Sequence, residues 1–246
     1  MAKIRAYHRP DTLEEALALL AHTDVDATIL AGGTVVNTIA DPIEVVDLQS
    51  VGLDAIVAAG ERVEIGAMVR LGELTSNEMI PAPLRDLARR EAPSTFRNVA
   101  TVGGTVATAD FESELLAGLL VFEATVTVVH AIGSETMALG DLFADRSRLG
   151  LGIITTVAIA TGGDAAAERT GRTPADRPIV AAVARRGDDG AVRLALTGVD
   201  ATPVLVDPAA TEELDPPGDF RGSSAYRREL ARVLTHRVMA RLGEAR

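Results

Sequence analysis

The chain has 246 residues, of which 47% are hydrophobic and none is cysteine, and its formal net charge is −11. A chain of this length can bury a large core, and without cysteine it cannot form a disulfide, bind an iron–sulfur cluster through its own thiolates or use a thiolate nucleophile. The negative charge argues against nucleic-acid binding, because such proteins present a basic surface to the phosphate backbone.

Targeting and metal-binding patterns are missing from the sequence. No apolar run approaches the roughly 18 residues of a membrane span, and residues 1–5 lack the apolar stretch of a signal peptide, so we expect a cytoplasmic protein without a membrane span. The four histidines are scattered without the spacing of metal ligands, and we expect no metal site.

The chain begins with a β-α-β-like pattern. Residues 12–22 predict a helix, because Asp11 or Thr12 can cap it and apolar side chains recur on one face. Apolar runs at 27–30 and 44–48 predict buried strands on either side of a glycine turn.

Strands and helices then alternate through the middle of the chain. Residues 62–67 and 124–130 alternate as strands do, and residues 71–74, 82–92 and 113–120 predict helices.

The composition changes near residue 170. Residues 161–176 are rich in Gly, Ala, Thr and Arg, and we place a domain boundary or a loop there. Residues 179–185 and 191–197 predict a β-hairpin, 204–206 a third strand, and 224–234 an amphipathic helix.

Two glycine turns are the most informative local feature: Ala31-Gly32-Gly33-Thr34 and Thr101-Val102-Gly103-Gly104-Thr105. Glycine accepts positive φ and has no Cβ, so successive backbone N–H groups can close around an anion, and the following Thr hydroxyl adds a donor. One such turn is more often only a tight connection, but the pair suits a diphosphate. Neither turn carries the Lys-Ser/Thr of a phosphate loop, which argues against a kinase-like nucleotide site.

Five segments occur in an order that is typical of one family: Ile29-Leu30-Ala31-Gly32-Gly33-Thr34, Val45-Val46-Asp47-Leu48, Ile65-Gly66-Ala67, Arg97-Asn98-Val99-Ala100-Thr101-Val102-Gly103-Gly104 and Ser224-Ala225-Tyr226-Arg227-Arg228. With them the chain resembles the FAD-binding medium subunit of molybdenum hydroxylases. That family includes the flavoprotein subunit of carbon monoxide dehydrogenase and the corresponding domain of xanthine dehydrogenase.

The resemblance implies an α+β fold. A FAD-binding domain of the PCMH type, with two α/β parts at about residues 1–55 and 56–170, would be followed by a C-terminal domain at residues 171–246. The C-terminal domain would contain a three-stranded antiparallel sheet with helices.

The resemblance also implies an oxidoreductase subunit. FAD on this chain would pass electrons from [2Fe-2S] clusters on a small partner subunit to an external acceptor, and a large partner subunit would carry the molybdopterin cofactor. The subunits would assemble as a heterohexamer. A flavin-free structural subunit with the same fold and interface is the alternative.

The family pattern transfers to sixteen candidate cofactor-binding positions in this chain, with both glycine turns cradling the diphosphate and Glu114 placed to accept a hydrogen bond from a ribose hydroxyl. These residues are Ile29, Leu30, Ala31, Gly32, Gly33, Thr34, Val35, Val36, Thr101, Val102, Gly103, Gly104, Thr105, Asp110, Glu114 and Ile154. No catalytic side chain is implied, and carboxylates such as Glu112 and Glu123 are expected to be solvated helix residues.

The chain departs from the family pattern at several places. The loop of residues 35–41 is short, Phe111 stands where relatives often have Pro, and strand 153–157 lacks an acidic residue. Arg177 stands where an aromatic residue is expected near the flavin, and its guanidinium plane can stack and stabilise a reduced, anionic flavin. Tyr226-Arg227-Arg228 is expected either to contact another subunit or to form the exposed face of the last helix.

Overall fold

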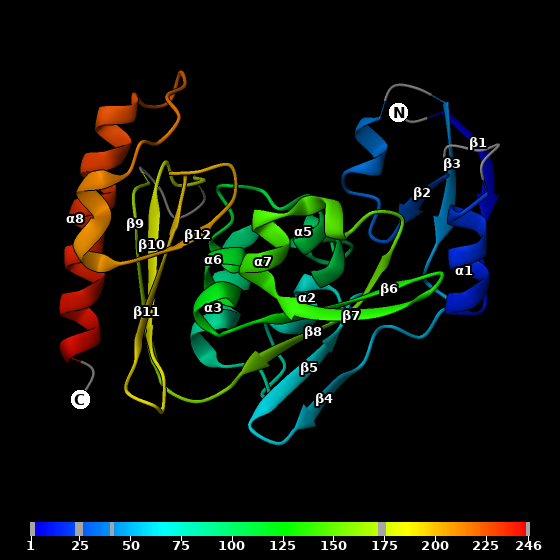
Figure 1. Ribbon diagram of the computed structural model, residues 1–246, viewed down its shortest axis with the longest axis horizontal. Helices are drawn as coiled ribbons and strands as arrows, with labels where there is room; N and C mark the ends of the chain where they lie inside the picture. Colours follow the sequence, from blue (N-terminus) through cyan, green and yellow to red (C-terminus); the bar gives the residue numbers. More distant parts are fainter. Residues whose placement is uncertain (1–2, 23–26, 40–41, 172–175, 245–246) are drawn as a thin grey trace.

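The computed structural model describes residues 3–22, 27–39, 42–171 and 176–244. Three β-sheets follow one another along the molecule, with helices between and around them (Figure 1). None of the helices in the described segments combines the length and the apolar character needed to cross a bilayer. The three sheets and their helices form a mixed α+β fold, as the sequence predicts.

The N-terminal sheet is parallel, with the order β1-β3-β2. It contains β1 (Lys3–His8), β2 (Ala27–Leu30) and β3 (Pro42–Asp47), with α1 (Leu13–Leu20) packed against it and the short η1 (Val36–Thr38) after the first glycine turn. Thr12 caps α1 by accepting a hydrogen bond from the Glu15 N–H at 3.2 Å. Because all three strands are parallel, their carboxyl ends meet at one edge, where the first glycine turn leaves β2.

The middle sheet is antiparallel, with the order β4-β5-β8-β6-β7. Its strands are β4 (Ile56–Ala59), β5 (Arg62–Gly66), β6 (Thr125–His130), β7 (Gly133–Ala138) and β8 (Ile153–Ala160). The helices of this part are α2 (Leu71–Leu74), α3 (Ala82–Glu91), α4 (Ser94–Arg97), α5 (Val102–Thr108), α6 (Glu114–Val121), α7 (Leu139–Ala144) and η2 (Arg146–Arg148).

The C-terminal sheet has four antiparallel strands, in the order β12-β11-β10-β9. They are β9 (Asp164–Arg169), β10 (Ala181–Arg186), β11 (Val192–Thr197) and β12 (Val204–Val206), followed by η3 (Pro208–Glu213) and the long α8 (Ser224–Glu244). The predicted three-stranded sheet is therefore wrong by one strand, since β9 occupies part of the expected loop at 161–176. The division into two domains at residue 170 stays a prediction.

Helix α6 connects the middle part to the C-terminal sheet. All its residues are buried, and it packs against α3 on one side and β10 and β11 on the other. Val183 of β10 and Ala195 of β11 belong to the same apolar cluster as Phe122 and the leucines of α6. The opposite face of the C-terminal sheet is covered by α8 (Figure 1).

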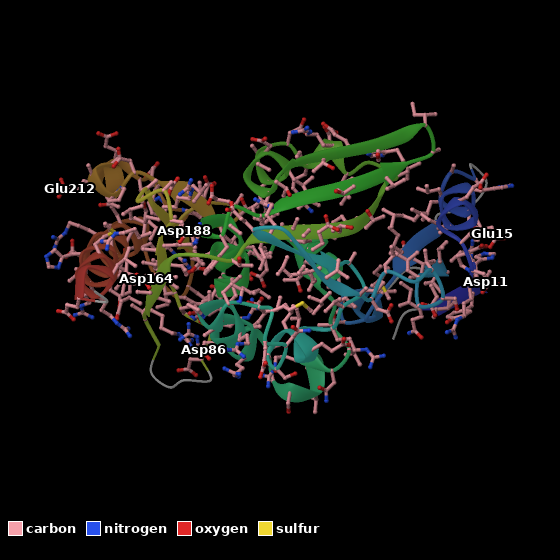
Figure 2. All side chains as sticks on the ribbon, turned by 90° about the horizontal axis from the view of Figure 1, so that it is seen from below. Asp11, Glu15, Asp86, Asp164, Asp188 and Glu212 are labelled. Carbon is pink, nitrogen blue, oxygen red and sulfur yellow. The ribbon has the colours of Figure 1, made fainter. Side chains whose placement is uncertain are left out.

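The negative charge is spread over the molecule. Figure 2 shows acidic side chains at the N-terminal end, on α3 in the middle and around the C-terminal sheet, labelled as Asp11, Glu15, Asp86, Asp164, Asp188 and Glu212. These six carboxylates therefore do not lie together on one acidic face.

Candidate cofactor site

A cavity of about 750 Å³ lies beside the two glycine segments. Its wall comes from β2 and the turn after it, from the start of α5, from the end of α3 and from residues 149–154 before and in β8. The volume is within the range that small-molecule and cofactor sites occupy.

Most of the predicted site residues line this cavity: Ile29, Ala31, Gly32, Gly33, Thr34, Val35, Val36, Thr101, Gly103, Gly104, Thr105, Asp110 and Ile154. Leu30, Val102 and Glu114 are not part of the lining. Val102 is 1% exposed and packs in the core, and Glu114 is 3% exposed at the start of α6. The structure thus brings two segments about 70 residues apart to one cavity wall.

The first glycine turn offers free hydrogen-bond donors. Among the described residues, no acceptor is found for the backbone N–H groups of Gly32, Gly33 and Thr34. Gly33 has a φ of 70°, in the left-handed region, and a Cβ on Gly32 would lie 1.9 Å from the carbonyl oxygen of Val99. Glycine at both positions therefore fixes a turn whose N–H groups remain available to an anion.

The second glycine segment is the first turn of helix α5. Its N–H groups are used within the chain: Val102 donates to the Val69 carbonyl at 2.9 Å, Gly103 to the Ala67 carbonyl at 2.8 Å, and Gly104 to the Thr101 hydroxyl at 3.1 Å. A Cβ on Gly103 would lie 2.6 Å from the Ala67 Cβ. The first glycine of this segment therefore permits close packing of α5 on the middle sheet.

Three charged side chains gather at one end of the cavity: Glu91, Asp110 and Arg177. The Arg177 guanidinium hydrogen-bonds to the Asp110 carboxylate, and its second amino group lies 3.8 Å from Glu91 Oε1. Asp110 Oδ1 also accepts a hydrogen bond from the Glu112 N–H at 3.0 Å. Arg177, which replaces the expected aromatic residue, is thus held at the cavity wall by carboxylates.

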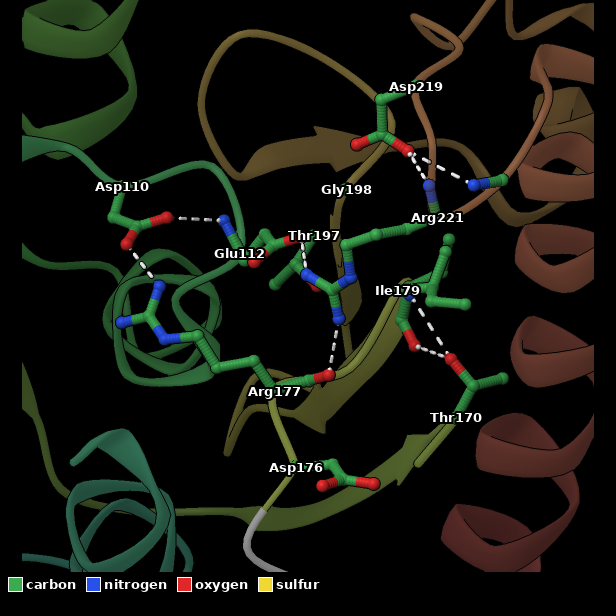
Figure 3. A network of polar contacts seen from close by, with 12 residues as sticks. Asp110, Glu112, Thr170, Asp176, Arg177, Ile179, Thr197, Gly198, Asp219 and Arg221 are labelled. Atoms are coloured by element: carbon green, nitrogen blue, oxygen red, sulfur yellow. Dashed lines mark hydrogen bonds and ion pairs between the residues drawn. The ribbon is translucent and has the colours of Figure 1, made fainter. Parts of the chain in front are cut away.

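A second arginine ties this cluster to the C-terminal part. The Arg221 guanidinium pairs with the Glu112 carboxylate and donates to the Arg177 carbonyl oxygen at 2.6 Å. Figure 3 shows the resulting ring, which runs from Asp110 through Arg177 and Arg221 to Glu112. The C-terminal part of the chain therefore fixes the segment 110–112 that borders the cavity.

Glu91 is a site residue that the sequence reasoning missed. Its side chain is 7% exposed, and burial raises its pKa, against the opposing effect of hydrogen bonds from Ser113 and the Leu115 N–H. The pattern of α3 contains a usable signal, since Glu91 follows the buried Leu84, Leu87 and Ala88 at helical spacing. A carboxylate on the apolar stripe of a helix marks a buried charge that needs an explanation.

Glu114 lies in a different environment from the one expected. Its carboxylate is 3.4 Å from Arg169 Nε and 3.6 Å from Arg90 Nη2. The hydrogen bond from Glu114 to a ribose stays a prediction.

Arg227 also differs from expectation, because it is fully buried and its guanidinium lies 6.0 Å from the centre of the Phe111 ring. The predicted exposed helix face is wrong at this position, since the side chain turns inward to the carbonyls of Ile179 and Gly198.

A second, smaller hollow of about 360 Å³ adjoins the large cavity. Arg9, Gly32 and Gln49 line it, so it lies at the carboxyl ends of all three strands of the parallel sheet. It shares four wall residues with the large cavity: Ala31, Gly32, Met68 and Thr101. Within the described residues no group of three or more histidine or carboxylate side chains is placed to hold a metal ion.

Comparison with known proteins identifies the family. The family described as "FAD binding domain in molybdopterin dehydrogenase" matches residues 2–159. The chain belongs to this family. The resemblance to the FAD-binding medium subunits is confirmed, and the chain is a member of a family of oxidoreductase subunits.

Relatives extend the similarity to the C-terminal part. The protein YgfM of Escherichia coli K12, described as uncharacterized, is 30% identical over 248 residues, covering 94% of this chain and 93% of YgfM. The carbon monoxide dehydrogenase medium chain of Afipia carboxidovorans is 27% identical, covering 96% of this chain and 95% of its own length. The structure of reconstituted CO dehydrogenase from Oligotropha carboxidovorans superimposes with a TM-score of 0.88 at 25% identity, covering 100% of both chains.

Proposed function

We propose that this chain is the FAD-binding electron-transfer subunit of a molybdenum-containing hydroxylase or dehydrogenase. It receives electrons from [2Fe-2S] clusters on a small partner subunit and passes them to an external acceptor. A large partner subunit carries the molybdopterin cofactor and oxidises the substrate. The three kinds of subunit assemble as a heterohexamer in the cytoplasm.

The observation that carries this proposal is the cavity with its free N–H donors. The N–H groups of Gly32, Gly33 and Thr34 are suited to the diphosphate, because oriented backbone donors stabilise an anion without bringing a side-chain charge. The apolar wall that includes Ile29 and Ile154 excludes water from the rest of the ligand. The residues present therefore fit a dinucleotide cofactor.

The side chains of this site bind and orient. Bound flavin supplies the redox chemistry, as cofactors do when a protein contributes only binding and electrostatics. Arg177 brings a positive charge and a planar group to the cavity, and both favour an electron-rich ring beside it. No side-chain acid, base or nucleophile is needed for electron transfer.

The first test is the FAD content of the purified protein. We expect an absorbance spectrum between about 300 and about 550 nm with flavin bands, and about one FAD per chain in the supernatant after heat denaturation. Colourless protein that takes up no added FAD, alone or with its partner subunits, contradicts the proposal.

The alternative is a flavin-free structural subunit with the same partners. It is favoured by one observation, that the N–H groups of Val102, Gly103 and Gly104 are already used within the chain and leave fewer donors for a diphosphate. Co-purification of the complete complex without flavin on this subunit would support the alternative.

A further inference from the structure

Glu91 is the buried ionisable group of the cavity that the proposed function does not use. It ends α3 and reaches the cavity with its side chain 7% exposed. Its Oε2 accepts a hydrogen bond from the Leu115 N–H at 3.2 Å, and Ser113 supplies a second one. The carboxyl group is therefore held in one place by α6 and cannot turn out to solvent without losing these partners.

The charges around Glu91 do not compensate it when it is ionised. Of the charged side chains that line the cavity in the described part of the chain, Arg177 is the cation, and it is hydrogen-bonded to Asp110. Glu91 lies 3.8 Å from the same guanidinium. One cation thus faces two carboxylates, and the cavity lining carries a net negative charge unless one of them is protonated.

The carboxylates on the neighbouring elements have arginine partners of their own. Glu112 of the adjoining loop is paired with Arg221. Glu114 of α6 lies between Arg90 of α3 and Arg169 of β9, at 3.6 and 3.4 Å. These arginines already face carboxylates of their own, so Arg177 remains the main positive partner of Glu91.

We propose that Glu91 is a cofactor-site residue that acts as a neutral acid: FAD binding favours transfer of a proton from solvent onto the Glu91 carboxyl, and FAD binds more weakly as the solution becomes alkaline. The inference rests on the proposed function, because it assumes that FAD occupies the cavity. No bond other than the O–H bond of Glu91 forms or breaks.

The physical basis is linkage between two negative charges. Burial already raises the pKa of Glu91 in the free protein. A diphosphate in the same cavity disfavours the ionised carboxylate further, so the ligand binds better to the protonated form. When one proton is taken up on binding, the dissociation constant rises by at most tenfold for each unit of pH across the titration.

The test is the pH dependence of FAD affinity. We would remove FAD from the purified full-length chain and measure the dissociation constant of added FAD, by its fluorescence, from about pH 5.5 to about pH 8.5. The dissociation constant of the wild type is expected to rise on the order of tenfold across this range, and that of Glu91→Gln to stay nearly constant. The matched control Glu78→Gln changes an exposed carboxylate outside the cavity and should follow the wild type.

If Glu91→Gln binds FAD poorly for structural reasons, the melting temperature of the FAD-free proteins provides a second test. The pKa of Glu91 is raised on folding, so the folded chain holds the carboxyl proton more tightly than the unfolded chain does. As the pH rises above the usual Glu range, ionisation of Glu91 therefore destabilises the folded wild type increasingly. The melting temperature of Glu91→Gln should therefore be higher than that of the wild type at about pH 8 and no higher at about pH 4.

Two results overturn the inference. A wild type whose FAD affinity does not change with pH, or a Glu91→Gln variant with the same pH dependence as the wild type, shows that Glu91 takes up no proton. If neither wild type nor Glu78→Gln binds FAD at any pH, the proposed function itself fails and the inference with it. A direct check is proton uptake in weakly buffered solution, where a tenfold change in affinity corresponds to at most about half a proton per FAD bound by the wild type, and the Gln variant should take up clearly less.

Discussion

Arg227 lies completely inside the molecule, although it sits in a Tyr-Arg-Arg sequence on the terminal helix. Its guanidinium donates to the Ile179 carbonyl at 2.9 Å, to the Gly198 carbonyl at 2.8 Å and to Asp219 at 2.6 Å. Gly198 in turn donates its N–H to the carbonyl of Phe111 at 2.8 Å. One buried cation thus joins α8, the C-terminal sheet and the segment that borders the cavity.

Arg227→Met tests this role. The change removes the guanidinium donor from the carbonyls of Ile179 and Gly198 and from Asp219 Oδ2, and we expect the free energy of unfolding to fall by about 2–4 kcal/mol. Arg232→Met is the matched control, because Arg232 is on the same helix and pairs with Glu229 at the surface. Urea unfolding followed by circular dichroism measures both, and equal effects of the two variants would contradict a structural role for Arg227.

At the scale of elements, the sequence pattern predicted those helices and strands that are determined by local signals. The hairpin β10–β11, the strand β2 and the helix α6 are strong patterns, and each lies close to its expected range. Strand β9 has the sequence Asp-Ala-Ala-Ala-Glu-Arg, which contains no β-branched residue, and it is extended because it pairs with β10 over its full length. Pairing with a strand elsewhere in the chain leaves no local trace, so composition alone indicated a loop.

The same distinction applies to the candidate site. The glycine segments could be recognised from sequence because glycine chemistry is local to the backbone. The positions of Glu91 and Arg221 depend on where α3 and the C-terminal part meet the loop 110–112, which no spacing along the chain reveals. Even the second glycine segment was recognised as a turn when it is the start of α5.

Helix α5 offers a pair of adjacent substitutions that separate packing from ligand contact. Gly103→Ala places a Cβ 2.6 Å from the Ala67 Cβ, and overpacking of this kind should lower stability by about 1–3 kcal/mol. Gly104→Ala meets the Thr101 hydroxyl oxygen at 3.1 Å, and the better helix propensity of alanine offsets the crowding by about 1 kcal/mol. Thermal melts should therefore show a loss for Gly103→Ala alone.

FAD binding by the stable Gly104→Ala variant then reports on the ligand. Both glycines line the cavity. A normal melting temperature with weakened FAD binding would place the cofactor against the start of α5, whereas unchanged binding would assign the diphosphate to the first turn.

At the scale of the whole molecule, α6 and the buried Arg185 form one of the attachments of the C-terminal sheet to the middle part. Arg185 of β10 is 2% exposed, and its guanidinium bonds to the Glu123 carboxylate at 2.8 Å, to the Gly162 carbonyl at 2.9 Å and to the Val121 carbonyl at 3.3 Å. It also lies 5.0 Å from the centre of the Phe122 ring. The end of α6 is therefore tied to the C-terminal sheet by charge as well as by apolar packing.

Arg185→Met should loosen this attachment. We expect the unfolding free energy to fall by about 2–4 kcal/mol and the urea transition to broaden, as the C-terminal sheet unfolds before the rest. Arg186→Met, at the next residue of the same strand, should leave the transition sharp. A transition that stays as steep as in the wild type would show that Arg185 does not couple the two parts.

Ala31, Gly32 and Thr101 line both the large cavity and the smaller hollow. Gly32 brings no side chain to either space, and a Cβ there has no room beside Val99. A molecule or partner side chain in the smaller hollow would therefore contact residues that also line the large cavity. Because coupling between two binding sites is reciprocal, an occupant of either space that shifts these shared residues changes the affinity of the other space by the same factor.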